Sequence, residues 1–172
     1  MTPLVALSLS IGLLGGIATV LYLHLGLAIW AGFIAWACFF HSGADTNALK
    51  QTIIGNIFGA LCAWLAALII LGVPGADRLG LPVWAGIVVG LTVFVMCIAA
   101  HLKALSNIPA SVYGYAATFA YLLLTAAAMV VAELTAVDFK RNALLFVILS
   151  MVLGALFGFA SKKLGDALTK KP

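Results

Sequence analysis

Long apolar runs alternate with short polar breaks along this chain of 172 residues. The runs cover residues 4–23, 25–40, 52–73, 83–100, 108–132 and 143–160. A helix needs about 20 apolar residues to cross the hydrocarbon core of a bilayer, whereas a membrane β-strand needs only about ten in alternation. The pattern therefore predicts an all-α integral membrane protein with six transmembrane helices, of which the second is unusually short.

The polar breaks carry residues that typically end and begin helices. Gly43 suits a left-handed cap after the second helix, and Pro82 and Pro109 suit the first turns of the fourth and fifth helices. The candidate N-caps of the third helix are Asp45, Thr46 and Asn47. These local signals support the boundaries that hydropathy gives.

Composition indicates the same class. Hydrophobic residues make up 65% of the chain and charged residues 8%, against about 25% charged in soluble domains, so lipid must be part of the solvent. The N-terminus has neither a basic region nor a cleavage site, and we expect a retained first helix rather than a signal peptide. Enzyme motifs are absent, and the isolated Cys38, Cys62 and Cys97 indicate neither disulfides nor a metal knuckle. We expect no catalytic activity, metal or cofactor.

Basic residues are distributed unevenly among the predicted loops. With both termini in the cytoplasm, the inside carries Lys50, Lys103 and a basic tail over residues 162–172 with four lysines. The outside carries Arg78 and the basic pair at 140–141. The positive-inside rule favours this orientation. We attribute the net charge of +4 to contact with anionic lipid headgroups, not to nucleic-acid binding.

A weak internal match divides the chain into halves. The triplet Asn-Ala-Leu occurs at 47–49 and at 142–144, and each copy is followed, after nine intervening residues, by Gly-Ala-Leu. The second and fifth segments also align. We interpret 1–75 and 82–161 as three-helix repeats, which must be inverted because three is odd, with a site where the halves meet. The alternative is chance, since Ala, Leu and Gly dominate the sequence.

Ionisable residues are missing from the predicted helix centres. The acidic residues lie at predicted helix ends or in loops and are Asp45, Asp77, Glu133, Asp138 and Asp166. A proton-coupled carrier usually needs such a group within the membrane. This distribution favours a neutral solute or a facilitated pathway over a pump.

Two polar breaks are candidate parts of a solute path. His41 and Ser42 follow the short second helix, which could stop partway and leave helix-end groups facing a cavity. Asn107 begins an Asn-Ile-Pro helix start, and Ser111 lies one turn later. The free N–H groups of this helix start could point into a pore, similar to the Asn-Pro-Ala motif of water and glycerol channels. The alternatives are an ordinary glycine-capped turn and an ordinary N-cap.

Further candidates lie within the helices. Tyr115, Thr118 and Tyr121 could line one face of the fifth helix, although a membrane Thr often bonds its own helix. Asn56 in the third helix is costly unless it is paired. Glycines at 12, 15, 16, 55 and 59 indicate close helix packing.

Several of these motifs carry a resemblance to a known family. Three motifs resemble a small bacterial inner-membrane family, domain of unknown function 1097. They are the run 30–33, the motif Phe-Phe-x-Ser-Gly at 39–43, and the motif Asn-Ile-Pro-Ala-Ser at 107–111 with Gly114. The resemblance covers nearly the whole chain and implies location in the bacterial inner membrane, but no activity. A looser similarity to urea-transporter-like and HPP-type membrane proteins is an analogy.

These observations favour a channel or facilitative transporter for a small polar or neutral solute, with the lipid bilayer as its surroundings. The alternative is a structural or accessory inner-membrane protein that transports nothing. Because the chain is short for an isolated transporter, we expect a homo-oligomer, either a dimer or a trimer.

Overall fold

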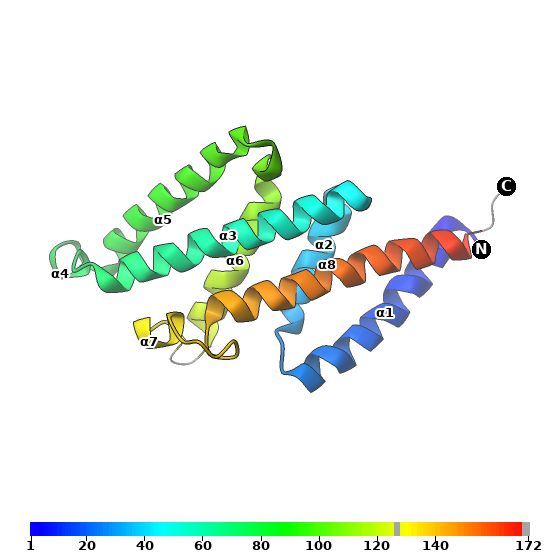
Figure 1. Ribbon diagram of the computed structural model, residues 1–172, viewed down its shortest axis with the longest axis horizontal. Coiled ribbons are helices and arrows are strands. Elements are labelled where there is room, and N and C mark those ends of the chain that lie inside the picture. Colours follow the sequence, from blue (N-terminus) through cyan, green and yellow to red (C-terminus); the bar gives the residue numbers. More distant parts are fainter. Residues whose placement is uncertain (126–127, 170–172) are drawn as a thin grey trace.

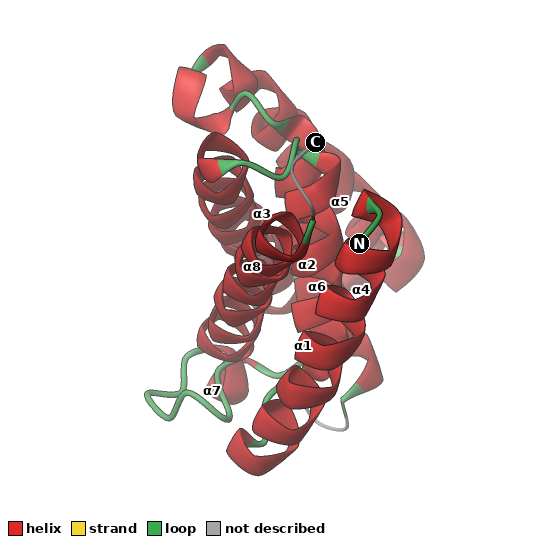
Figure 2. Cartoon of the chain, turned by 90° about the vertical axis from the view of Figure 1, so that its right-hand side faces the viewer, coloured by secondary structure: helices red, strands yellow, loops and turns green. Residues whose placement is uncertain are grey.

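A computed structural model of the chain describes residues 1–125 and 128–169. In those ranges the backbone forms helices and loops and no strand (Figure 2). The long helices are α1 (Pro3–Leu25), α2 (Ile29–His41), α3 (Thr46–Gly72), α5 (Leu81–Ile98), α6 (Ile108–Leu124) and α8 (Ala143–Leu168). The short ones are α4 (Ala76–Leu79), η1 (Ala99–His101), η2 (Lys103–Leu105) and α7 (Val131–Leu134).

Each long helix coincides with an apolar run, but some ends differ from the prediction. Helix α3 begins before its apolar run, at Thr46, in agreement with the predicted cap, because the Asp45 carboxylate accepts a 2.6 Å hydrogen bond from the Ala48 N–H. Helix α6 ends earlier, at Leu124, where Thr125 has an extended backbone. Helix α8 continues to Leu168, so the first part of the predicted tail is helical. Lys170 and Lys171 of that tail lie outside the described residues.

The protein is an all-helical membrane protein. Among the described residues, four helices are long and apolar enough to cross a bilayer, namely α1, α3, α5 with η1, and α8. Helices α2 and α6 are apolar but have only 13 and 17 residues. At about 1.5 Å per residue, α2 extends roughly 20 Å, less than the roughly 30 Å of a hydrocarbon core. The short second helix that the sequence predicted is therefore present.

Helices α3 and α8 form the centre of the molecule (Figure 1). They lie side by side and run in opposite directions. Helix α6 packs closely on α3 and α2 packs closely on α8, while α5 lies along α3 and α1 lies along α8. Figure 2 shows α2 and α6 against the α3–α8 pair. The start of α1, the start of α3 and the end of α8 lie at the same end of the molecule in Figure 1.

Glycines allow the crossing helices to touch through their backbones. A Cβ atom on Gly59 of α3 would overlap the carbonyl of Ser111 on α6, and a Cβ on Gly114 would overlap the carbonyl of Asn56. Gly154 of α8 meets the backbone of Gly32 on α2 in the same way. Close approach of this kind lets van der Waals contact hold helices together in lipid, where no hydrophobic force acts between them.

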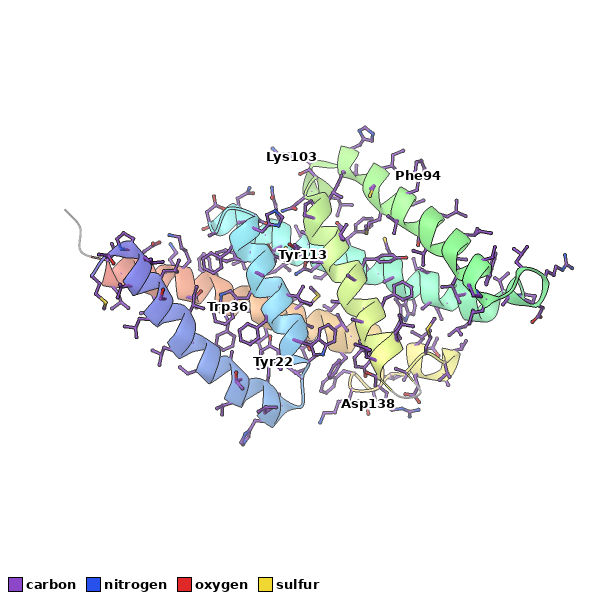
Figure 3. All side chains as sticks on the ribbon, turned by 180° about the vertical axis from the view of Figure 1, so that it is seen from behind. Tyr22, Trp36, Phe94, Lys103, Tyr113 and Asp138 are labelled. Atoms are coloured by element: carbon purple, nitrogen blue, oxygen red, sulfur yellow. The ribbon has the colours of Figure 1, made fainter. Side chains whose placement is uncertain are left out.

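Two glycines of α1, Gly12 and Gly16, differ from the prediction of close packing. Gly12 and Gly16 have no heavy atom of a described residue within 4 Å of an added Cβ, and the same is true of Gly86 and Gly90 on α5. Both helices present apolar side chains outward, such as Phe94, which is 63% exposed and points away from the bundle in Figure 3. Gly12 and Gly16 therefore serve no contact within the described chain, whereas a Cβ on Gly15 would meet the Phe33 ring of α2 at 3.8 Å.

Buried hydrogen bonds connect α1 and α2 to α8. The Tyr22 hydroxyl donates to the Ser150 carbonyl at 2.5 Å, and the Ser150 hydroxyl accepts from the Ala28 N–H at 3.2 Å. The Trp36 indole donates to the Ser161 hydroxyl at 3.1 Å. Tyr22 and Trp36 both lie between α1 and α2 in Figure 3, where they belong to one core cluster with α8. This part of the molecule pairs its buried polar groups internally.

Candidate functional site

A polar network joins the end of α2, the first turns of α3 and the start of α6. Asn107 caps α6, because its side-chain oxygen accepts a 3.1 Å hydrogen bond from the Ala110 N–H. Its side-chain nitrogen donates to the Ser42 hydroxyl at 2.8 Å and to the side-chain amide oxygen (Oε1) of Gln51 at 3.3 Å. The fold thus brings together Ser42 and Asn107, two candidates from separate polar breaks.

Gln51 is the member of this network that the sequence interpretation missed. It lies just before the apolar run that begins at residue 52 and was not among the candidate residues. In the structure it lies within α3. A usable signal was present, since Gln51 is the only glutamine of the sequence and directly precedes a membrane segment.

His41 lies at the rim of this network. Its Nδ1 atom is 3.1 Å from the Tyr113 hydroxyl, and the two rings meet edge to face with centroids 6.1 Å apart. Figure 3 places Tyr113 between α2 and α6, at the same end of the molecule as Lys103. His41 and Tyr113 therefore tie the end of α2 to the first turns of α6, and His41 itself is exposed.

Three buried polar side chains extend this region into the helices. Thr52 and Asn56 are one turn apart on α3, immediately after Gln51, and Ser111 is one turn after Asn107 on α6. Their exposed fractions are 0%, 2% and 1%. Four of their side-chain atoms have no conventional hydrogen-bond partner in the described part of the chain: Thr52 Oγ1, Asn56 Nδ2, Asn56 Oδ1 and Ser111 Oγ. Thr52 has only the Cys38 thiol beside it, which is a weak hydrogen-bonding group.

These residues belong to the tightest helix contact of the fold. The backbone of Ser111 lies against Gly55 and Gly59, and the backbone of Asn56 lies against Gly114. An unsatisfied buried polar group costs about 1–3 kcal/mol. The α3–α6 contact therefore retains unpaired polar atoms where an apolar surface would be more stable.

The remaining candidates on α6 contact different neighbours. The Tyr115 hydroxyl is 2.9 Å from the Thr92 hydroxyl on α5. The Thr118 hydroxyl donates to the Gly114 carbonyl of its own helix at 3.0 Å, as membrane threonines often do. Tyr121 donates to the Lys140 carbonyl at 3.3 Å, beyond the other end of the helix. The structure therefore does not bring Tyr115 and Tyr121 onto the same surface.

Charged side chains flank this network without belonging to it, since Asp45, Lys50 and Lys103 each lie within four residues of one of its members. In the connection between α6 and α8, the Arg141 guanidinium binds the Glu133 carboxylate, with Nε to Oε2 at 2.9 Å. The hydrogen bond from Arg141 holds the pKa of Glu133 below its ordinary value. No group of three His, Cys, Asp or Glu side chains within the described ranges could hold a metal ion. The candidate site is therefore built from neutral hydrogen-bonding groups.

Comparison with known proteins identifies the family. The profile of a family described as "Protein of unknown function (DUF1097)" matches residues 8–166. The chain belongs to the DUF1097 family. A similar protein is the "Inner membrane protein YcdZ" of Escherichia coli strain K12, which is 29% identical over 165 residues, or 96% of this chain and 87% of YcdZ. No solved structure matches the chain.

Membership in the DUF1097 family confirms the resemblance that the motifs at 39–43 and 107–111 carried. The motifs of the resemblance also coincide with the polar network, since they contain Ser42 and Asn107. The DUF1097 chain and its relative YcdZ are thus membrane proteins, for which the family description supplies no activity.

Proposed function

We propose that this DUF1097 protein is a channel or facilitative transporter for a small neutral polar solute in the bacterial inner membrane. One observation carries the proposal: the unpaired, buried polar atoms of Thr52, Asn56 and Ser111 continue from the network of Asn107. Hydrocarbon offers such atoms no partner. A path that admits a polar molecule would supply one.

The charge distribution supports a neutral solute. The Asp45 carboxylate is occupied as the cap of α3, and Asp166 pairs with Lys162 on the last turns of α8. Glu133 pairs with Arg141 in a connection between helices. An ion-coupled transporter usually needs an ionisable group within the membrane, and Thr52, Asn56 and Ser111 carry none. We therefore propose facilitated movement without ion coupling.

Helix packing supports six spans in two inverted repeats, 1–75 and 82–161. In this pairing α1 matches α5, α2 matches α6 and α3 matches α8. The contact between α3 and α6 then has its counterpart in the contact between α8 and α2. The contact between α3 and α5 likewise has its counterpart in the contact between α8 and α1. The antiparallel course of α3 and α8 agrees with inversion (Figure 1). In such proteins the site lies between the halves. With both termini cytoplasmic, the Asn107 network would open toward the cytoplasm.

Flux through liposomes containing the purified protein tests this function. The probes are urea, acetamide and glycerol, with potassium and chloride as charged comparators. Asn107→Ser retains an N-cap for α6 but removes the donor to Ser42 and Gln51. We expect neutral solutes to pass and this variant to lower their flux about fivefold, which corresponds to one hydrogen bond.

The matched control is Asn142→Ser. Asn142 caps α8 and also donates hydrogen bonds, at 3.2 Å to Leu134 and 2.9 Å to Ala136, away from the proposed path. The Asn142→Ser variant should leave solute flux unchanged. Absence of flux for every probe with folded protein, or equal flux in Asn107→Ser and the wild type, would contradict the proposal.

The alternative is an accessory membrane protein that transports nothing. It is favoured by the outward faces of α1 and α5, where Gly12, Gly16, Gly86 and Gly90 meet no described residue. A second copy of the chain, giving the proposed dimer or trimer, or another membrane protein could pack there. Mass measurement in nanodiscs tests the homo-oligomer. A stoichiometric partner co-purified from native membranes, together with absent flux, would support the accessory role.

A further inference from the structure

Buried polar groups are treated differently at the two closest helix contacts of the molecule. At the α2–α8 contact, Ser150 donates to the Phe146 carbonyl at 2.8 Å and accepts from Ala28 at 3.2 Å. At the α3–α6 contact, Asn56 and Ser111 have no partner among the described residues. The fold can therefore satisfy polar groups in this kind of contact but does not do so between α3 and α6.

The proposed repeat gives the residues that stand at the corresponding positions of the other half. The offset of 95 residues between the triplets at 47–49 and 142–144 superposes Thr52 on Val147 and Asn56 on Met151. Val147 and Met151 are 0% and 1% exposed. Apolar side chains thus fill the same places on α8, and packing alone does not require polar ones on α3.

The offset of 82 residues between α2 and α6 gives the same result for Ser111. It superposes Ser111 on Ile29 at the start of α2. Each of the three unpaired polar residues therefore matches an apolar residue in the other half. Retaining all three is costly in lipid, which calls for a ligand that compensates them.

The chemistry of the three side chains defines that ligand. Asn56 offers both donors and an acceptor, and the hydroxyls of Thr52 and Ser111 can each donate or accept. None carries a charge. The ligand must therefore combine donors and acceptors in one neutral molecule, and it must be small because all three residues are almost fully buried.

We propose that Thr52, Asn56 and Ser111 form a binding site for one small neutral molecule of the size of water, urea or acetamide. The site lies between α3 and α6 and has no counterpart between α2 and α8. This inference rests on the proposed function, since the bound molecule is the solute that the path admits. It makes the α3–α6 contact the place where solutes are selected.

Flux and thermal stability measured together test the site. Asn56→Leu keeps the side-chain size and removes the unpaired polar atoms. We expect urea flux to fall at least about tenfold, the loss of more than one hydrogen bond, while the melting temperature stays equal or rises. Thr52→Val should act in the same direction. Ser150→Ala is the control and should lower the melting temperature, because it deprives the Ala28 N–H of its acceptor.

A labelling experiment separates the site from transport. In a folded variant without Cys38, Cys62 and Cys97, Ser111→Cys should react with a small water-soluble thiol reagent, and urea should slow the reaction. Ser150→Cys should stay unreactive. Labelling with protection by urea, but without flux in any variant, would keep the site and reject transport.

Two results would overturn the site. The first is unchanged flux in Asn56→Leu and Thr52→Val, which would leave transport intact and place the path elsewhere. The second is a lower melting temperature in Asn56→Leu with no labelling of Ser111→Cys, which would show that Asn56 has a structural role only.

Discussion

Replacing Gly59 by alanine should destabilise the protein more than any other glycine-to-alanine change on a long helix. The added Cβ would overlap the Ser111 carbonyl and approach the Ser111 carbonyl carbon at 2.7 Å and the Tyr115 nitrogen at 2.8 Å. All of these are backbone atoms of α6, so no side-chain rotation can relieve the overlap. The two helices must separate along their contact.

The magnitude follows from overpacking and helix propensity. Inserting a methyl group into a tightly packed contact costs about 1–3 kcal/mol, and here the upper end applies because the backbone itself must move. Gly90→Ala on α5 meets no described heavy atom within 4 Å and should gain up to about 1 kcal/mol from helix propensity. The propensity gain applies at both sites, so the two variants should differ by the overpacking cost alone, about 3 kcal/mol.

Reversible unfolding in detergent, followed by the helical circular dichroism signal, measures this difference. Gly59→Ala should unfold at a clearly lower denaturant concentration than the wild type, and Gly90→Ala at an equal or higher one. Equal stability of the two variants would refute the reasoning, because it would mean that α3 and α6 do not meet through their backbones.

Two further predictions concern the hydrogen bonds outside the α3–α6 contact. Tyr22→Phe leaves the Ser150 carbonyl without its buried donor, and we expect a loss of about 1–2 kcal/mol in the same unfolding assay, with no change in flux. Glu133→Gln removes the ion pair with Arg141. Because the pKa of Glu133 is lowered in the folded protein, its stabilising effect is present above the ordinary carboxyl pKa and disappears as the pH falls through the lowered value. The variant should therefore melt slightly below the wild type at neutral pH and together with it in strong acid, and a difference that persists in acid would contradict the ion-pair interpretation.

The membrane class and the helices followed from the sequence alone. Each apolar run forms a helix. The free energy of transfer into lipid depends on each residue separately, and a helix pairs its backbone groups within its own segment, so both can be predicted from local sequence. Local capping was also readable, as the Asp45 and Asn107 caps show. Two ends were predicted wrongly. The apolar run to residue 132 continued after α6 had ended at Leu124, and α8 continued to Leu168 beyond its apolar run.

The candidate site was only partly readable. Ser42 and Asn107 were candidates from the sequence, and the tertiary structure joined them through a hydrogen bond of 2.8 Å. Gln51 was missed because its role depends on where α6 begins in space, not on its neighbours in the chain. Tyr115 and Tyr121, which looked equivalent along α6, reach different partners.

What the sequence by itself determined was the number of apolar runs, the turns between them and the family. Only the tertiary structure decided which glycines touch another helix, since Gly59 is packed and Gly12 faces outward although both lie in similar surroundings along the chain. The physical reason is that lipid provides no hydrophobic force between helices. Their pairing depends instead on shape at the contact, where small residues let two backbones meet, and that fit exists only once both surfaces are in place.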